Sequence, residues 1–425
     1  MKKNPLKRLE TQVIISLILA IIAGIYLPQI VPYISWMGEI FMKMLKVFLA
    51  PLLFFSVFIA VLGLGDFKKL GNIGARTMGY YMLTTVLAIS VSLILMNVFT
   101  PGVGSTLGIE AGFNAATIES LTFSAFIQSL IPSNIFVAFV EFNAMQIVTC
   151  GIVLGISVLA GGKMKKIDHL KNITETINNG ILKFIEFVIK LTPFGVFAIV
   201  AKVVSEHGIE SMINLLPFVY VILLALFIHA FITLPSIGFI IGGFNPYHYF
   251  LKVKEAILVG FSTSSSSATM GLSMSVAKNK AKLSEEVVDF TFPIGTTINM
   301  DGTALYQAGV ALFVAQVLGV DLTIIAQLTI VAIVILASIG AAGVPGAGIL
   351  ILTTVFLTIG LPVEAIGIIL AVDRILDMFR TGVNVWGDLL TAKVVDKFYR
   401  KNLTDKALKK IEELKICEKS KELTA

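Results

Sequence analysis

Two long stretches of the chain contain no lysine or arginine. They lie between Arg76 and Lys163 and between Lys282 and Arg374, and both are strongly apolar. Across the chain 14% of the residues are charged, against about 25% in ordinary globular proteins, which excludes a soluble enzyme. The rest of the chain holds further apolar runs of the length needed to cross a bilayer, about 20 residues. The sequence therefore predicts an all-α polytopic membrane protein.

The apolar runs and the positive charges between them define the expected topology. Judged by the length of a membrane-crossing helix, spans fall at about 11–31, 36–65, 76–99, 121–142 with 144–160 as a broken pair, 173–204 and 212–243. Lysines and arginines cluster at 2–8, 68–76, 163–171, 252–254, 278–282 and 393–410. Since positive loops stay on the cytoplasmic side, both termini are expected inside a plasma or inner membrane. The net charge of +6 then reflects topology and not nucleic acid binding.

Two apolar segments are interrupted in the middle by small residues. Segment 254–278 encloses FSTSSSSAT at 261–269, and segment 322–361 is broken by SIGAAGVPGAG at 338–348. The first begins and ends at cytoplasmic lysines, so it must enter the membrane and return. Irregular backbone at bilayer depth persists only inside protein or beside a wet cavity, and such broken helices are typical of inverted-repeat transporters. We predict two re-entrant helical hairpins; the alternative is two pairs of short helices joined by ordinary turns.

A stripe of polar residues runs along the expected last helix. Asp373, Asp377, Arg380, Asn384 and Asp388 follow one another at steps of 4, 3, 4 and 4, which places them on one helix face. An ionisable group at membrane depth costs about 3 kcal/mol, so it faces protein or a wet cavity. We interpret the stripe as one wall of a binding site for a charged solute and its accompanying cations.

Two further features supply suitable chemistry for such a site. The guanidinium of Arg380 matches a carboxylate, although it can equally pair internally with Asp373 or Asp377. Residues 295–303 read GTTINMDGT after Pro293, which indicates unwound helix whose oxygens suit a small hard cation; Asp301 can also be a purely structural partner. Helix N-terminal amides at 264–267 would attract a carboxylate. The lack of a His or Cys cluster disfavours zinc and copper.

Together these motifs resemble the glutamate transporters, the dicarboxylate/amino acid:cation symporters. The matching residues are 264–269, NMDGTALYQ from Asn299, AGVPGAG at 342–348 and DxxxDMxRTxxNVxGD at 373–388. The resemblance covers nearly the whole chain. It implies eight transmembrane helices plus two re-entrant hairpins, inverted repeats, a homotrimer and an elevator mechanism. Gln307 stands where proton- and potassium-exchanging animal members carry glutamate, which implies a simpler prokaryotic, sodium-coupled homologue.

The resemblance also implies a division into domains. A scaffold would comprise 1–72 (spans one and two) and 101–208 (spans four and five). A transport domain would comprise 73–100 (span three) and 209–398 (span six, hairpin one, span seven, hairpin two and span eight). Residues 399–425 would form a cytoplasmic tail, expected as an exposed helix from about residue 401 on its alternating charged and apolar residues.

The resemblance assigns roles to individual residues. Asp377 would bind the substrate amino group and Arg380 its side-chain carboxylate. The other pocket residues would be Thr303, Thr381, Asn384 and the amides of Ser265 and Ser266, with Val344 and Gly348 closing over them. One sodium ion would use Gly295, Asn299, Asn384 and Asp388. A second would use Thr297, Met300 and the backbone around Ser338, Ile339 and Ala341. A third would use Tyr81, Thr84, Thr85, Asn299 and Asp301.

Arg374 has two interpretations. Some archaeal members carry an arginine at the place of Ser264, and Arg374 would replace that charge near the carboxylates. Alternatively it stabilises Asp373 alone, which we slightly favour.

The expected function is sodium-coupled uptake of aspartate or glutamate by a protein embedded in membrane lipid. Proton coupling, or a C4-dicarboxylate or neutral amino acid as substrate, remains open on the same fold. A channel is a competing class, because charged rings also line pores. An enzyme is not expected, since no nucleophile–His pairing is evident among four histidines.

Overall fold

The computed structural model describes residues 9–63, 72–105, 131–140, 144–161, 164–339, 348, 352–353, 355–356, 359–363 and 365–422. The secondary structure of these residues is helical. The helices of the first half are α1 (Leu9–Tyr26), α2 (Val31–Lys46), α3 (Leu49–Gly63), α5 (Asn72–Phe99), α8 (Ile135–Val140), α9 (Ala144–Gly161), α10 (Met164–Lys190) and α11 (Thr192–His207). Those of the second half are α12 (Glu210–Ile213), α13 (Leu216–Ile228), η3 (His229–Thr233), α14 (Leu234–Ile240), α15 (Pro246–Thr263), α16 (Ser266–Asn279), α17 (Glu285–Ile298), α18 (Asp301–Val317), α19 (Ile324–Ile339) and α21 (Ala365–Glu422).

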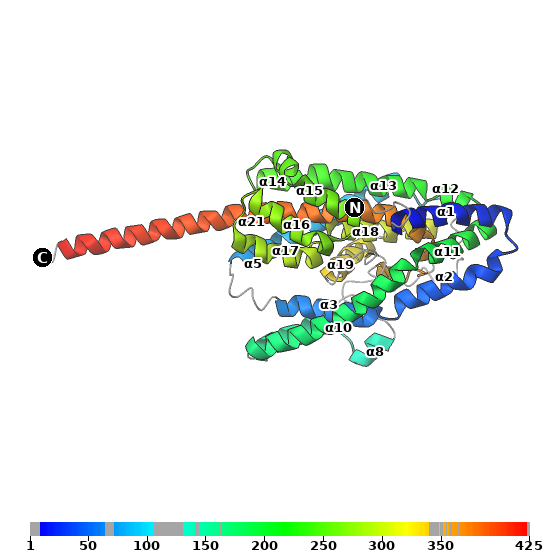
Figure 1. Ribbon diagram of the computed structural model, residues 1–425, viewed down its shortest axis with the longest axis horizontal. Helices are drawn as coiled ribbons and strands as arrows, with labels where there is room; N and C mark the ends of the chain where they lie inside the picture. The colour runs from blue at the N-terminus through cyan, green and yellow to red at the C-terminus, as the bar shows by residue number, and fades with distance from the viewer. Residues whose placement is uncertain are drawn as a thin grey trace, which may run out of the picture.

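Long apolar helices run side by side along the length of the bundle (Figure 1). In the part of the chain that the structure describes, Ile73–Phe99 and Glu210–Ile240 are each long and apolar enough to cross a membrane. The pair Lys166–Lys190 and Thr192–His207 makes a third candidate if it counts as one span. The eight-span layout stays a prediction, because several expected spans fall partly on residues outside the described ranges.

Two of the expected single spans are each divided into two helices. The run at 36–65 breaks between α2 and α3, at Val47 and Phe48. The run at 173–204 bends by 52° between α10 and α11, with Pro193 in the first turn of α11. Proline lacks an N–H and its ring clashes with the carbonyl of the preceding turn, so it starts a helix but interrupts one that is already running.

The predicted first hairpin is a pair of packed helices, α15 and α16. It begins at Pro246, earlier than residue 254. Ser264 ends α15 in the left-handed region, with φ 49°, and the Ser265 hydroxyl then caps α16 by accepting from the Ala268 amide at 3.1 Å. At the other end, Lys278 pairs with Asp289 of α17 at 2.7 Å, and this hydrogen bond raises the pKa of Lys278.

The predicted unwinding at 295–303 is confirmed between α17 and α18. Asn299 and Met300 have non-helical backbone angles and separate the two helices. α18 packs against both α5 and α21, and it is buried from residue 301 to 315. The break therefore lies deep in the protein, where its polar groups meet those of neighbouring helices.

The second predicted hairpin is described only in part. α19 forms its first helix, and Gly348 is helical and buried. Most of the expected tip at 338–348, including Ala341 and Val344, lies outside the described residues.

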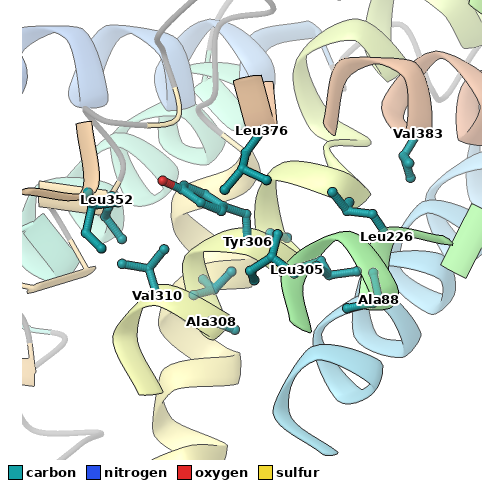
Figure 2. Packing of buried hydrophobic residues seen from close by; sticks show 14 of the residues in the cluster. Ala88, Leu226, Leu305, Tyr306, Ala308, Val310, Leu352, Leu376 and Val383 are labelled. Atoms are coloured by element: carbon teal, nitrogen blue, oxygen red, sulfur yellow. The ribbon is translucent and has the colours of Figure 1, made fainter. Parts of the chain in front are cut away.

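The last helix, α21, is 58 residues long, about 87 Å at 1.5 Å per residue. Its first half runs through the bundle, and its second half projects beyond it towards the C-terminus (Figure 1). The predicted tail helix is therefore a continuation of α21. Tyr306 and Leu305 of α18, Leu376 and Val383 of α21 and Leu226 of α13 belong to one hydrophobic cluster (Figure 2). This cluster fixes the faces of α18 and α21 that carry the polar residues.

Candidate substrate and cation site

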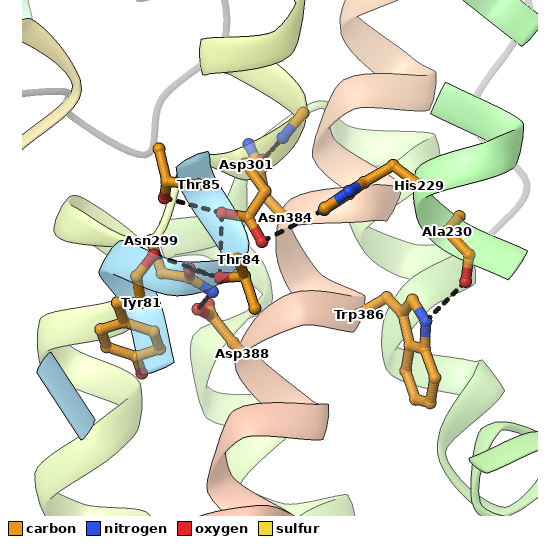
Figure 3. Close-up of polar contacts among 11 residues, drawn as sticks. Tyr81, Thr84, Thr85, His229, Ala230, Asn299, Asp301, Asn384, Trp386 and Asp388 are labelled. Atoms are coloured by element: carbon orange, nitrogen blue, oxygen red, sulfur yellow. Dashed lines mark hydrogen bonds and ion pairs between the residues drawn. The ribbon is translucent and has the colours of Figure 1, made fainter. Parts of the chain in front are cut away.

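One group of polar side chains joins α5 to the break between α17 and α18 (Figure 3). The Asp301 carboxylate accepts hydrogen bonds from Thr85 at 2.8 Å and Thr84 at 3.2 Å. Thr84 also lies 3.2 Å from the Asn299 side-chain oxygen. All four side chains are 0% exposed. Residues more than 200 positions apart in the sequence thus share one buried cluster.

A second carboxylate, that of Asp388 on α21, adjoins this group. Its Oδ1 accepts from the Asn299 amide at 2.9 Å. A Cβ at Gly295 would overlap the Asp388 carboxylate and the Tyr81 hydroxyl, so only glycine lets α17 approach α21 here. Tyr81 itself donates to the Thr291 carbonyl at 2.9 Å.

The donors in this cluster suit a hard monovalent cation. Asp301, Asp388, Asn299, Thr84 and Thr85 offer carboxylate, amide and hydroxyl oxygens, the ligand type that unwound helices in transporters present to Na⁺ or H⁺. A buried carboxylate needs a positive partner. No group of three His, Cys, Asp or Glu side chains that would hold a transition metal occurs among the described residues.

The sequence-based interpretation missed His229. Its Nε2 lies 3.4 Å from Asp301 Oδ2, and both side chains are fully buried. His229 begins the short π-helix η3, and the next residue, Ala230, accepts a hydrogen bond from Trp386 of α21 at 3.0 Å. π-helical turns are frequent at functional sites. The sequence did contain a signal for His229, because a histidine inside an apolar span is an ionisable group at membrane depth and such groups are usually functional.

The Arg380 side chain forms the centre of a second polar group. It is fully buried, with Nη2 at 2.9 Å from Asp377 and 3.0 Å from Asp373. Its guanidinium lies 3.9 Å from the centroid of the Tyr306 ring, a cation–π contact that the sequence did not suggest. Arg380 Nε and Nη1 have no hydrogen-bond partner among the described residues. The internal salt bridge that the sequence left open is therefore present, and two donors remain for a ligand.

Neighbouring elements enclose this arginine. A Cβ at Gly348 would lie 3.2 Å from Arg380 Nη1, so Gly348 lies against the guanidinium. A Cβ at Gly260 of α15 would lie 3.7 Å from Thr381, and the Phe261 ring packs edge-on against Phe379 at 5.0 Å. The ends of both hairpin segments thus meet the same turn of α21.

Asn384 lies between the two polar groups. Its Nδ2 donates to Thr303 at 3.1 Å and contacts the Met300 sulfur at 3.3 Å. Its Oδ1 accepts from the Gly302 amide at 2.8 Å. One residue of α21 therefore contacts both the break, at Met300, and the first turn of α18.

The remaining predicted site residues lie at the ends of α16, α17 and α19. Ser265 and Ser266 are buried at the start of α16. The Thr297 hydroxyl donates to the Ile294 carbonyl of its own helix at 3.0 Å. Ser338 and Ile339 end α19, and their side chains, like Ala341 and Val344, lie outside what the structure describes.

The favoured expectation, that Arg374 stabilises Asp373, stays a prediction, and Asp377 is a further partner of Arg374. Arg374 Nη1 lies 3.3 Å from Asp377 Oδ2, and both side chains are buried. Adjacent residues on a helix do not face each other, whereas residues three apart do. The helix geometry thus explains the pair with Asp377.

Comparison with known proteins identifies the family. The model of the Sodium:dicarboxylate symporter family matches residues 9–398. The chain belongs to this family. It is therefore a transporter and not an enzyme. A proton/sodium-glutamate symport protein of Geobacillus stearothermophilus is 31% identical, covering 92% of this chain and 94% of its own length. The excitatory amino acid transporter 3 of Mus musculus is 32% identical over 92% and 86% of the two chains. A C4-dicarboxylate transport protein of Bacillus subtilis is 28% identical over 96% and 98%.

Proposed function

We propose that this symporter takes up aspartate or glutamate together with sodium ions. The observation that carries the proposal is Arg380, which is fully buried and keeps two donors without a partner among the described residues. A substrate carboxylate would accept a charge-assisted hydrogen bond from one of these donors. Asp377, which contacts the same guanidinium, would then receive the substrate amino group.

The ion-coupling proposal rests on the oxygen cluster around Asp301 and Asp388. Sodium ions are cargo in this scheme, and their charge would balance the buried carboxylates. The names of the relatives support a cation, since one is a proton/sodium-glutamate symport protein. Proton coupling is the second candidate on the strength of the same name. The roles proposed for Gly295, Thr297, Met300 and the 338–341 backbone follow the family resemblance.

The wider architecture is proposed as an elevator. α1 and α2 each pack on α11, whereas α5, α15, α16, α17 and α18 each pack on α21. This division supports a scaffold of 1–72 and 101–208 and a moving domain of 73–100 and 209–398. We also propose that the chain assembles into homotrimers in a cell membrane, with both termini on the cytoplasmic side.

Reconstitution into proteoliposomes tests the function. Labelled aspartate, glutamate, succinate and alanine are offered under separately imposed sodium and proton gradients. We expect saturable accumulation of aspartate or glutamate driven by an inward sodium gradient. Accumulation in sodium-free buffer under a pH gradient would replace sodium by protons. Movement of the labelled substrate only down its own concentration gradient would indicate a channel.

His229→Ala should raise the sodium concentration for half-maximal uptake by about 10-fold, the lower end of the effect of losing a partner that orients a metal ligand. The change removes the contact to Asp301 Oδ2 and leaves that oxygen less restrained. His229→Gln keeps an N–H donor and should recover most of the affinity. Sodium titrations of uptake measure both variants, and equal curves for wild type and His229→Ala would contradict the assigned contact.

A further inference from the structure

Three buried threonines lie on three helices that pack against one another. They are Thr77 of α5, Thr291 of α17 and Thr391 of α21, and none is more than 1% exposed. The three helices contact each other pairwise. None of the three side chains belongs to the oxygen cluster around Asp301 or to the group around Arg380. We call these three side chains the threonine layer.

The positions one helical turn away, on one side of the threonine layer, belong to the oxygen cluster. Tyr81, Gly295 and Asp388 each lie three or four residues from the threonine of the same helix. A Cβ at Gly295 would overlap both the Tyr81 hydroxyl and the Asp388 carboxylate, so the three helices meet at this level. The Tyr81 hydroxyl also donates a hydrogen bond to the Thr291 carbonyl at 2.9 Å, which ties α5 to the threonine of α17.

The positions one turn away on the other side are apolar. Ile73, Val287 and Val395 are buried and belong to one hydrophobic cluster. Each of them lies four residues from the threonine of the same helix. Because the same three helices meet in the row before and in the row after, their threonines are brought together between the two rows. The threonine layer therefore separates the oxygen cluster from an apolar row.

Two hydroxyls of the threonine layer lack an internal partner. Thr77 Oγ1 and Thr391 Oγ1 are buried and have no hydrogen-bond partner among the described residues. A buried threonine in a helix can donate to the carbonyl of the preceding turn, as Thr291 does to Val287 at 2.8 Å. Residues three or four apart share a helix face, so Thr77 and Thr391 face the same interior as the rows on either side. A buried hydroxyl without a partner is unfavourable, which favours a polar ligand in contact with these two.

We propose that the threonine layer is a transit position for sodium ions, on the route between the oxygen cluster and the cytoplasmic ends of α5 and α21. This inference rests on the proposed sodium coupling. Hydroxyl oxygens are hard ligands that suit a small cation, and the Asp388 carboxylate one turn away attracts it. Affinity for a cation rises with the number of charged ligands. Three neutral hydroxyls hold the ion less strongly than the oxygen cluster does, so the ion passes through without being stored.

The apolar row explains how such a route stays closed. The side chains of Ile73, Val287 and Val395 carry no oxygen for an ion, and hydrophobic constrictions block ions by excluding water. Beyond this row the Arg76 guanidinium lies 4.5 Å from the centroid of the Phe398 ring, and its positive charge repels a cation. An ion therefore leaves only when the cytoplasmic ends of these helices separate.

Rapid mixing with sodium chloride tests the route on the purified full-length protein. A Trp36→Phe background leaves Trp386, two residues before Asp388, as the only tryptophan, and its fluorescence follows sodium binding. In Thr77→Val/Thr391→Val the rates of sodium binding and release should fall by about 10-fold or more, since two hydroxyl contacts are lost. The half-saturating sodium concentration should change by less than about 3-fold, because a contact made only in transit alters the barrier and not the bound state.

The matched controls are a rescue and a distant threonine. Thr77→Ser/Thr391→Ser keeps both hydroxyls and should recover most of the wild-type rate. Thr174→Val removes a hydroxyl of the same kind from α10, where it donates to the Leu170 carbonyl at 2.8 Å, and should leave both rates unchanged. Equal rates in wild type and the double valine variant would overturn the inference. Loss of rate and of sodium affinity to the same extent would also overturn it and indicate a structural role.

A variant expected to gain rate covers the case in which the double valine variant does not fold. Val395→Thr has nearly the same shape and places a hydroxyl in the apolar row, so sodium exchange should become about 3-fold faster or more. An unchanged or slower rate would contradict the inference. Failure of the proposed function gives a different result, because wild-type proteoliposomes would then accumulate no labelled aspartate under a sodium gradient.

Discussion

Arg380→Ala is expected to abolish the uptake of acidic amino acids. The guanidinium is fully buried, lies on the Tyr306 ring and keeps Nε and Nη1 available for a carboxylate. Truncating one partner of a buried, hydrogen-bonded charge pair costs about 2–5 kcal/mol, which corresponds to a fall in kcat/KM of roughly 30-fold to several thousand-fold. Initial rates of labelled aspartate uptake into proteoliposomes, taken over a range of concentrations, measure the loss.

Loss of stability must be separated from loss of binding in this variant. Without Arg380 the carboxylates of Asp373 and Asp377 lose a shared partner, so a lower thermal stability in detergent is also expected. Arg380→Lys restores the charge without the planar fork, and it should recover stability more than uptake. Sodium binding to purified Arg380→Ala provides the folding control. Unchanged aspartate affinity in Arg380→Ala would remove this residue from the site.

Asp301→Asn is expected to abolish sodium-driven uptake. The substitution keeps the size of the side chain and an oxygen for Thr85 and Thr84, but removes the charge at the centre of the cluster. We expect the sodium affinity to fall by about 100-fold or more, since loss of an outer partner of a metal ligand alone costs 10–100-fold. Sodium titrations of aspartate binding and uptake measure the change.

The control for Asp301→Asn is Asp289→Asn. Asp289 is half-exposed and pairs with Lys278 at the base of the first hairpin, so its neutralisation should leave the sodium dependence as it is. An Asp301→Asn protein with the half-maximal sodium concentration of wild type would show that Asp301 is a structural partner only, the alternative that the sequence left open.

The features that were predicted correctly from the sequence are those that depend on residues close to one another in the chain. The serine run at 261–269 implied a chain reversal, and the turn occurs at Ser264. The NMD motif after Pro293 implied unwinding, and Asn299 and Met300 are non-helical. The stripe from Asp373 to Asp388 followed from helical periodicity and the cost of burying charge. In each case neighbouring residues in the chain carry the information.

Features that depend on tertiary contacts were not predicted. The bend at Leu191 was not predicted, because apolar residues continue on both sides of it. Pro193 was nevertheless a local signal for a break in the helix. The contact between His229 and Asp301 joins residues 72 positions apart, and no periodicity in the sequence relates them. The same holds for Tyr306 beneath Arg380. A sequence shows that a buried charge needs a partner, but the packing of helices selects which partner it has.

Asn384 lies one helical turn from Arg380 and one turn from Asp388 on α21, which would couple the two halves of the proposed site. Its amide contacts Thr303 and Met300, and its oxygen receives the amide of Gly302, the residue after Asp301. Binding of a ligand in the Arg380 group or in the Asp301 group would therefore shift the Asn384 side chain, and this shift would change the geometry of the other group. Thermodynamic reciprocity then requires that whatever factor sodium adds to the affinity for substrate, substrate adds to the affinity for sodium. Under the proposed sodium coupling, the two ligands would therefore bind together on the side of the membrane where sodium is abundant and dissociate together on the side where it is scarce.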